Sequence, residues 1–159
     1  MSGLREGTLM FSAARRRLLF AAAGTTLIAV AVPRARAANT QLAKTEWQAI
    51  KKVISQQLAA LRAGDSVKAF GYATPGIQAQ FGDASNFMTM VRNAYSPLLD
   101  ARYDEFLEGA VIDGVIVQPL RLIGRDNTVL VAIYTMERQK RSGWRISGCV
   151  IAPSTVQAA

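Results

Sequence analysis

The sequence contains no histidine and only one cysteine, Cys149. Without histidine, the chain cannot form a catalytic triad, a proton shuttle or a metal site that depends on an imidazole. A lone cysteine cannot form an intramolecular disulfide, so the fold must be stabilised by its hydrophobic core. Half of the 159 residues are hydrophobic, which is enough for one globular domain.

Acidic residues are also scarce: the chain has 11 acidic and 19 basic side chains, which gives a formal net charge of +8. Such an excess is typical of proteins that bind nucleic acid. Six of the arginines and one of the acids, however, precede Ala38, so residues 38–159 carry 13 basic and 10 acidic side chains and a net charge of only +3. We therefore expect no nucleic-acid partner for this part of the chain.

Residues 15–37 have the order of an export signal peptide. A basic start is followed by an apolar run without charge over residues 20–32. The whole apolar stretch, about 15 residues, is shorter than the roughly 20 that span a bilayer. Two small residues, Ala35 and Ala37, flank the predicted cleavage site. We expect cleavage after Ala37, which divides the chain into a signal peptide (1–37) and a single domain (38–159).

The details of this segment resemble twin-arginine export signals. Three consecutive arginines, Arg15, Arg16 and Arg17, precede a Leu-Leu pair, and two further arginines lie just before the cleavage site. The resemblance implies that a twin-arginine translocase and a signal peptidase are partners during export, and that the domain is released in a bacterial periplasm. Ala14 departs from the pattern, which prefers Ser or Thr there. A general secretory signal and an uncleaved anchor are the alternatives.

The first half of residues 38–159 predicts helices. Thr45 and Gln48 have the spacing of a capping box at the N-terminus of a long helix. Gly64 is placed to end this helix. Apolar residues at helical spacing form its expected buried face: Trp47, Ile50, Ile54, Leu58 and Leu61.

Residues 65–97 predict three shorter helices. Each is expected to begin at a residue whose side chain caps the helix: Asp65, Thr74 (followed by Pro75), and Asp83 or Ser85. Helix-breaking residues predict where the last two stop: Gly82 and the pair Ser96-Pro97.

From Tyr103 onward the pattern changes to β-rich segments separated by short turns. Because the turns are short, consecutive strands should pair as antiparallel hairpins. Pro119 lacks a backbone N–H and predicts an edge position or a bulge in the second strand. The fold class is therefore α+β, with N-terminal helices packed on a curved four-stranded antiparallel meander. The expected strands cover residues 103–112, 115–123, 128–139 and 144–152.

Short segments spread over the domain carry a likeness to a known family, among them Gly64-Asp65, Ala73-Thr74-Pro75, Phe81-Gly82, Tyr134-Thr135-Met136-Glu137 and Gly143-Trp144-Arg145-Ile146. With the order of helices and strands, they resemble a family of exported bacterial domains of unknown function within the nuclear transport factor 2-like (cystatin-like) superfold. The resemblance implies a cone-shaped fold whose open end becomes a pocket, and a homodimer formed through the exposed sheet face. It implies no activity, because the superfold hosts isomerases, dehydratases, ligand binders and assembly modules.

Two functions fit this reading. The first is a non-enzymatic module that binds a small apolar ligand or a protein partner. The alternative, which rests on the resemblance alone, is a small isomerase- or dehydratase-type enzyme that uses the cone pocket, similar to ketosteroid isomerase or scytalone dehydratase. Such an enzyme needs a buried carboxylate or histidine as base and a tyrosine or acid as hydrogen-bond donor. The carboxylates that could serve as this base fall near turns or on a polar strand, where we expect them to be solvated: Asp100, Asp104, Glu105, Glu108 and Asp113. We therefore assign no catalytic residue, no metal site and no cofactor.

Aromatic and sulfur-containing side chains are the candidates for lining a pocket: Tyr72, Phe81, Met88, Tyr95 and Tyr134. The tyrosines would supply hydroxyl groups to a ligand; the other interpretation is that their rings pack in the core. Cys149 is expected to be a small buried residue, because a nucleophilic thiolate needs a base or a cation beside it.

Overall fold

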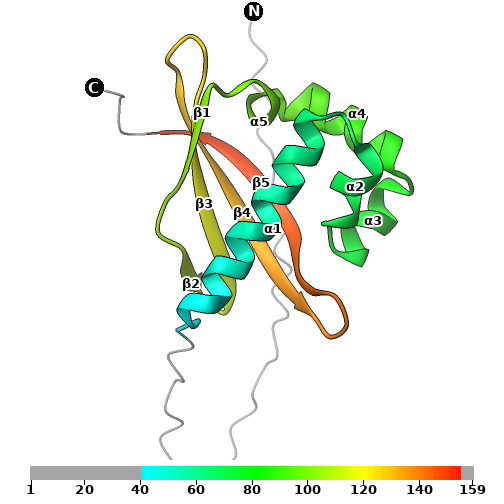
Figure 1. Cartoon of the computed structure of the whole chain (residues 1–159), viewed down its shortest axis with the longest axis vertical. Helices are drawn as coiled ribbons and strands as arrows, with labels where there is room; N and C mark the ends of the chain where they lie inside the picture. Colours follow the sequence, from blue (N-terminus) through cyan, green and yellow to red (C-terminus); the bar gives the residue numbers. More distant parts are fainter. Residues whose placement is uncertain (1–40, 155–159) are drawn as a thin grey trace, which may run out of the picture. The chain divides into compact units, whose positions relative to one another are not determined.

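The computed structural model describes residues 41–154, so the predicted signal peptide and its cleavage site lie outside the described residues. Over this range all of the helices precede all of the strands (Figure 1). The strands form one open antiparallel sheet, and α1 crosses one face of it. The predicted α+β class, with N-terminal helices on an antiparallel meander, is confirmed.

The long helix α1 (Lys44–Arg62) packs on the sheet through the predicted apolar face, in which Ile50 and Ile54 are completely buried. Its start differs from the prediction. Ala43 is the N-cap residue, and its carbonyl accepts hydrogen bonds from the backbone N–H groups of Glu46 and Trp47. The capping box at Thr45 was therefore wrong, because the helix begins before it and has no side-chain cap. Packing of the apolar face takes the place of that cap.

Three short helices follow, α2 (Ser66–Gly71), α3 (Pro75–Phe81) and α4 (Ala84–Ala94). Each has the side-chain cap expected from the sequence, provided by Asp65, Thr74 and Asp83 respectively. Of the two candidates for the last cap, Asp83 is the one that accepts from a backbone N–H, at 2.8 Å. Gly82 ends α3 with a φ of +77°, a conformation that glycine adopts without a steric penalty.

The pair Ser96-Pro97 follows the end of α4 but also starts a further helix, α5 (Ser96–Asp100), that we did not predict. Proline is tolerated in the first turn of a helix because no intrahelical partner exists for an N–H there. Leu98 of this short helix is buried in the core. The same residues therefore end one helix and begin the next.

The sheet contains β1 (Tyr103–Phe106), β2 (Ala110–Ile112), β3 (Val115–Ile123), β4 (Val129–Gln139) and β5 (Gly143–Pro153). The order is β1-β3-β4-β5, with β2 paired to the same edge of β3 as β1. The meander was predicted, but the first expected strand is divided into β1 and β2. The described sheet has five strands for this reason, instead of the four expected.

The division of the first strand lies opposite Pro119. Phe106 pairs with Leu120 and Ala110 pairs with Val117, so the interrupted side holds one extra residue. The prediction of an edge position for Pro119 was wrong, since β3 lies between two neighbours. The irregularity instead falls on the partner, where the backbone N–H of Leu107 donates to the Pro119 carbonyl at 3.1 Å.

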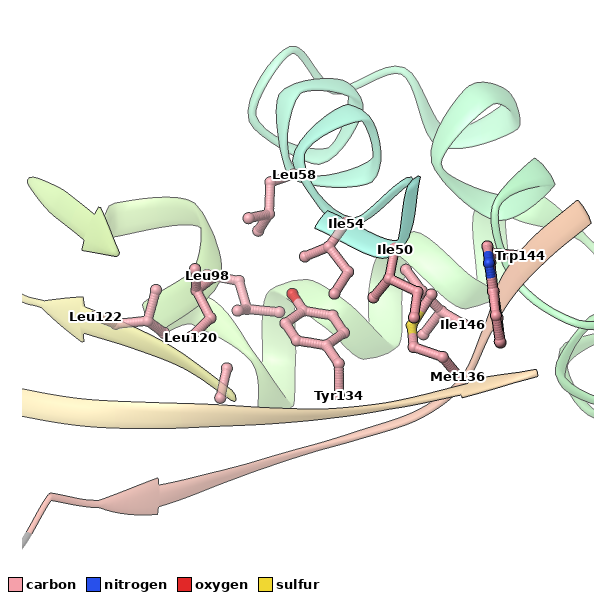
Figure 2. Packing of buried hydrophobic residues seen from close by; sticks show 11 residues of the cluster. Ile50, Ile54, Leu58, Leu98, Leu120, Leu122, Tyr134, Met136, Trp144 and Ile146 are labelled. Atoms are coloured by element: carbon pink, nitrogen blue, oxygen red, sulfur yellow. The ribbon is translucent and has the colours of Figure 1, made fainter. Parts of the chain in front are cut away.

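The buried side chains form two clusters. The first, which we call the sheet core, lies between α1 and the sheet and includes Ile50, Ile54, Tyr134, Met136 and Trp144 (Figure 2). The second, which we call the helical core, joins the end of α1 to α2 and α4 through Leu61, Ala69, Phe87, Met88 and Val91. In Figure 1 the short helices α2, α3 and α4 gather at one end of α1, beside β5.

Candidate functional site

A pocket of about 370 Å³ lies where the sheet core meets the helical core. Its lining comes from α1, α3, α4, α5, β4 and β5, so it opens between the helices and the inner face of the sheet. Most of this lining is apolar, as Leu61, Phe87, Val91 and Leu98 illustrate. The volume falls within the range of small-molecule sites, which is about 300–1,000 Å³.

The edge of β5 explains why space remains beside it. The backbone of Thr74 donates to the carbonyl of Ile146, and the backbone of Ile146 donates to the carbonyl of Tyr72, both at 2.9 Å. These bonds attach the link between α2 and α3 to the sheet edge. A bulge places Ser147 out of register there, and the next residue, Gly148, has no side chain. Because the residues at this edge are small and the link between α2 and α3 is held against it, space remains beneath α3 and α4.

Tyr134 lies at the junction of the pocket and the sheet core. Its side chain is only 1 % exposed, and the ring rises from β4 toward α1 (Figure 2). Within residues 41–154 its hydroxyl has no oxygen or nitrogen partner and interacts with the thiol of Cys149. A thiol is a weak hydrogen-bonding group, so this buried hydroxyl is only weakly satisfied.

The neighbouring polar groups of the pocket are already hydrogen-bonded. The Tyr95 hydroxyl donates to the backbone carbonyl of Cys149 at 2.9 Å. The side-chain amide of Gln57 donates to the carbonyl of Ala69 at 3.2 Å. The carbonyl of Leu98 accepts from the guanidinium of Arg62 at 3.1 Å.

The pocket is electrostatically neutral. None of its lining residues carries a formal charge. Burial raises the pKa of Tyr134 well above its ordinary value, and it also raises the pKa of Tyr95. Burial likewise raises the pKa of the Cys149 thiol to about 12. All three groups therefore stay protonated at neutral pH, so the site offers hydroxyl donors and lacks a thiolate nucleophile.

Three of the five residues proposed from the sequence line this pocket: Phe81, Tyr95 and Tyr134. Tyr72 instead packs against the sheet core, half-buried. Met88 is buried inside the helical core.

Gln57 and Ser147 also line the pocket, and neither was predicted from the sequence. Gln57 lies on the apolar face of α1, and an amide among residues expected to be buried was the signal that could have identified it. Ser147 carried no such signal, because its place depends on a bulge between two strands.

The carboxylates of the fold lie away from the pocket lining and several form ion pairs. Asp104 pairs with Arg62 at 3.0 Å, and Glu46 pairs with Arg138 at 2.7 Å. Among the described residues, no group of three or more acidic or cysteine side chains could hold a metal ion. No helix in the same range is long and apolar enough to cross a membrane.

A second hollow of about 390 Å³ adjoins the pocket and is more polar. Ile77, Gln80 and Ser147 line both. Thr74 and Glu137 belong to the second hollow alone.

The chain matches the model of a known family over most of its length. A family model described as a domain of unknown function (DUF4864) matches residues 43–159. No curated protein and no solved structure matches the chain. The matched range contains every element of the described fold.

Proposed function

The chain belongs to this family of domains of unknown function, and we propose that it is a non-enzymatic module that binds a small, mainly apolar molecule in the pocket. The observation that carries the proposal is a pocket of about 370 Å³ with an apolar, uncharged lining. Concave apolar sites with a few placed polar groups are the usual form of small-molecule sites.

The same lining argues against an isomerase or a dehydratase. Those reactions need a base within hydrogen-bond reach of the substrate. The lining contains no carboxylate, and the pocket tyrosines have raised pKa values, so neither hydroxyl is ready to accept a proton at neutral pH. Binding without chemistry is the function that this arrangement supports better.

Native mass spectrometry of the purified full chain tests the proposal. Ala94 is exposed on α4 and lines the pocket, so Ala94→Trp should fill the space without disturbing the core. Asn93→Trp is the matched control, since Asn93 is also exposed on α4 but lies outside the lining. We expect extra mass on the wild type and on Asn93→Trp, lost on denaturation, and none on Ala94→Trp. A bare wild-type mass would count against a retained ligand.

We also propose that the domain acts in a bacterial periplasm after twin-arginine export and cleavage behind Ala37. The support is the order of basic, apolar and small residues in the first 37 positions. Replacing both Arg16 and Arg17 by lysine should leave the precursor inside the cell. Amino-terminal sequencing of the wild type from the periplasmic fraction should begin at Ala38, and a chain that retains residues 20–37 would refute the proposal.

The nuclear transport factor 2-like superfold is our proposal for the architecture, supported by a long helix crossing one face of an antiparallel meander (Figure 1). We further propose a homodimer through the other sheet face, where Val150 is 62 % exposed and Val115 and Ile112 are also exposed. Sedimentation of the wild type and of Val150→Arg tests this. A dimer that the arginine converts to a monomer supports it, and a monomeric wild type contradicts it.

A further inference from the structure

A hollow of about 410 Å³ lies between the first half of α1 and the hairpin that joins β4 to β5, which is orange in Figure 1. None of the described residues that line it also lines the apolar pocket. Thr45 and Lys52 face it from α1, two helical turns apart. We call it the basic hollow, because three of its four charged lining residues are cations: Glu46, Lys52, Arg138 and Arg145.

The acid of the basic hollow is already paired. One carboxylate oxygen of Glu46 forms an ion pair with Arg138 at 2.7 Å, and the other accepts a hydrogen bond from the indole N–H of Trp144. The guanidinium of Arg138 also lies over the Trp144 ring, 5.9 Å from its centre. Glu46 and Arg138 therefore form a fixed wall in which their charges cancel.

The other two cations of the basic hollow lack an opposite charge. Neither Lys52 nor Arg145 forms an ion pair within residues 41–154. Arg145 donates one N–H to the carbonyl of Trp144 at 2.9 Å, and a guanidinium has five such donors. Glu137 lies opposite Arg145 in the strand register, but its carboxylate accepts from the side chain of Gln139 at 3.3 Å and lines the hollow beside Thr74.

We propose that the basic hollow binds the phosphate group of a phosphate monoester. At neutral pH such a group carries a charge of about −1.5 to −2 and three acceptor oxygens. The lining carries three cations and one acid, a net charge of +2 that this group balances. The hydroxyls of Thr45 and Ser142 belong to the same lining and add neutral donors. This site and its ligand go beyond the proposed function, which concerns the apolar pocket.

Two soluble probes test the demand for a double charge: 2-glycerophosphate, a monoester, and dimethyl phosphate, a diester with a single negative charge. Their affinities for the full-length protein are measured from the indole N–H resonance of Trp144, which belongs to the wall of the basic hollow.

Four variants, each with one charge fewer, separate this site from a general attraction of anions to the basic surface. Lys52→Gln and Arg145→Gln change residues of the lining. Lys51→Gln and Arg141→Gln are the matched controls, because they change neighbouring positions of the same helix and the same hairpin that lie outside the lining.

We expect the wild type to bind glycerophosphate about tenfold more tightly than dimethyl phosphate, and each lining variant to weaken glycerophosphate binding about fivefold. The two control variants should change that affinity less than about twofold, because exposed charges outside the site are screened by salt.

Equal affinities for the two probes, or equal weakening in all four variants, would overturn the proposal and indicate a diffuse attraction of the hairpin to polyanions or to an anionic membrane surface. A Trp144 resonance that glycerophosphate does not shift would overturn it as well. In each case the proposed function of the apolar pocket would stand, since the two sites share no lining residue in the described chain.

Discussion

The two ends of the interface between α1 and the sheet are built from the same helix and the same strands, yet only one of them holds a mainly apolar pocket. The other, which we call the closed end, has a filled apolar interior, and a hollow of about 410 Å³ at its surface is lined by charged residues such as Glu46, Lys52 and Arg138. At the closed end, large side chains from both layers meet: Ile50 of the helix, and Met136 and Trp144 of the strands (Figure 2). At the open end, Leu61 and Tyr134 face a pocket into which β5 contributes Gly148 and Cys149. Packing is complete where both layers supply large residues and incomplete where one supplies small ones.

The closed end is also fixed by polar contacts at its rim. The carboxylate of Glu46 accepts a hydrogen bond from the indole of Trp144 and pairs with Arg138. At the pocket, the Tyr95 hydroxyl donates to the carbonyl of Cys149, but the lining residues are uncharged and form no ion pair. The difference indicates that stability comes mainly from the closed end, and that the open end is available for binding.

The largest expected effect is the loss of a side chain from the closed end. Ile50 is completely buried, so Ile50→Ala should lower the free energy of unfolding by about 4 kcal/mol. The matched change Ile77→Ala removes atoms from a half-buried residue of the pocket and should lower the free energy of unfolding by only about 1 kcal/mol. Urea denaturation of both variants measures this difference. Equal losses would show that the two ends are packed alike.

A smaller effect is expected at Gly109, in the link between β1 and β2. A Cβ atom at this position would overlap the ring of Trp47, so Gly109→Ala should destabilise the fold by about 2 kcal/mol. Gly71→Ala is the control, because nothing lies near a Cβ there and the residue belongs to a helix. That control should be neutral or slightly stabilising. Thermal unfolding compares the two, and an unaffected Gly109→Ala would mean that the Trp47 ring moves aside freely.

The raised pKa of the Cys149 thiol, at the open end, predicts that the stability of the fold depends on pH. The pKa of Cys149 is raised to about 12 in the folded state, whereas an unfolded thiol titrates near 9. The folded state therefore holds the proton more tightly, and its advantage is complete below pH 9 and is lost as pH rises toward 12. The wild type should lose about 1 kcal/mol per pH unit above pH 9 relative to Cys149→Ala. Parallel stability curves for the two proteins between pH 8 and pH 11 would contradict this.

The smallest effects separate the two tyrosines of the pocket. Tyr95→Phe loses a hydrogen bond to the Cys149 carbonyl and should cost about 1 kcal/mol. Tyr134→Phe removes a hydroxyl that has no oxygen or nitrogen partner and only a weak interaction with the Cys149 thiol, so it should leave the stability nearly unchanged. Denaturation midpoints of the two variants in the ligand-free protein measure the contrast. A clear loss in Tyr134→Phe would mean that its hydroxyl has a stronger partner in solution.

The features that the sequence predicted well depend on neighbours along the chain. The apolar face of α1 follows from a period of 3.6 residues, and the caps at Asp65, Thr74 and Asp83 act within their own helices. The start of α1 was misplaced because a local capping pattern at Thr45 was outweighed by packing against the sheet.

The features that were missed depend on residues far apart in the chain. The break between β1 and β2 lies where Gly109 passes the Trp47 ring of α1, a contact that no local pattern reveals. The pocket likewise depends on the pairing of Thr74 with Ile146 and on the bulge at Ser147. Sequence patterns therefore proposed Phe81, Tyr95 and Tyr134 as pocket residues by type alone, without the geometry that brings them together.

The most direct test of the central claim, that the open end accepts a small, mainly apolar molecule and the closed end does not, is methionine-methyl NMR of the full-length protein titrated with 2-acetylnaphthalene. Met90 lines the pocket, whereas Met136 is buried in the sheet core. We predict that the Met90 methyl resonance shifts on addition of this probe through the ring current of the naphthalene, while that of Met136 stays in place. A titration in which Met90 does not move, or in which both methyl groups move together, would contradict the account.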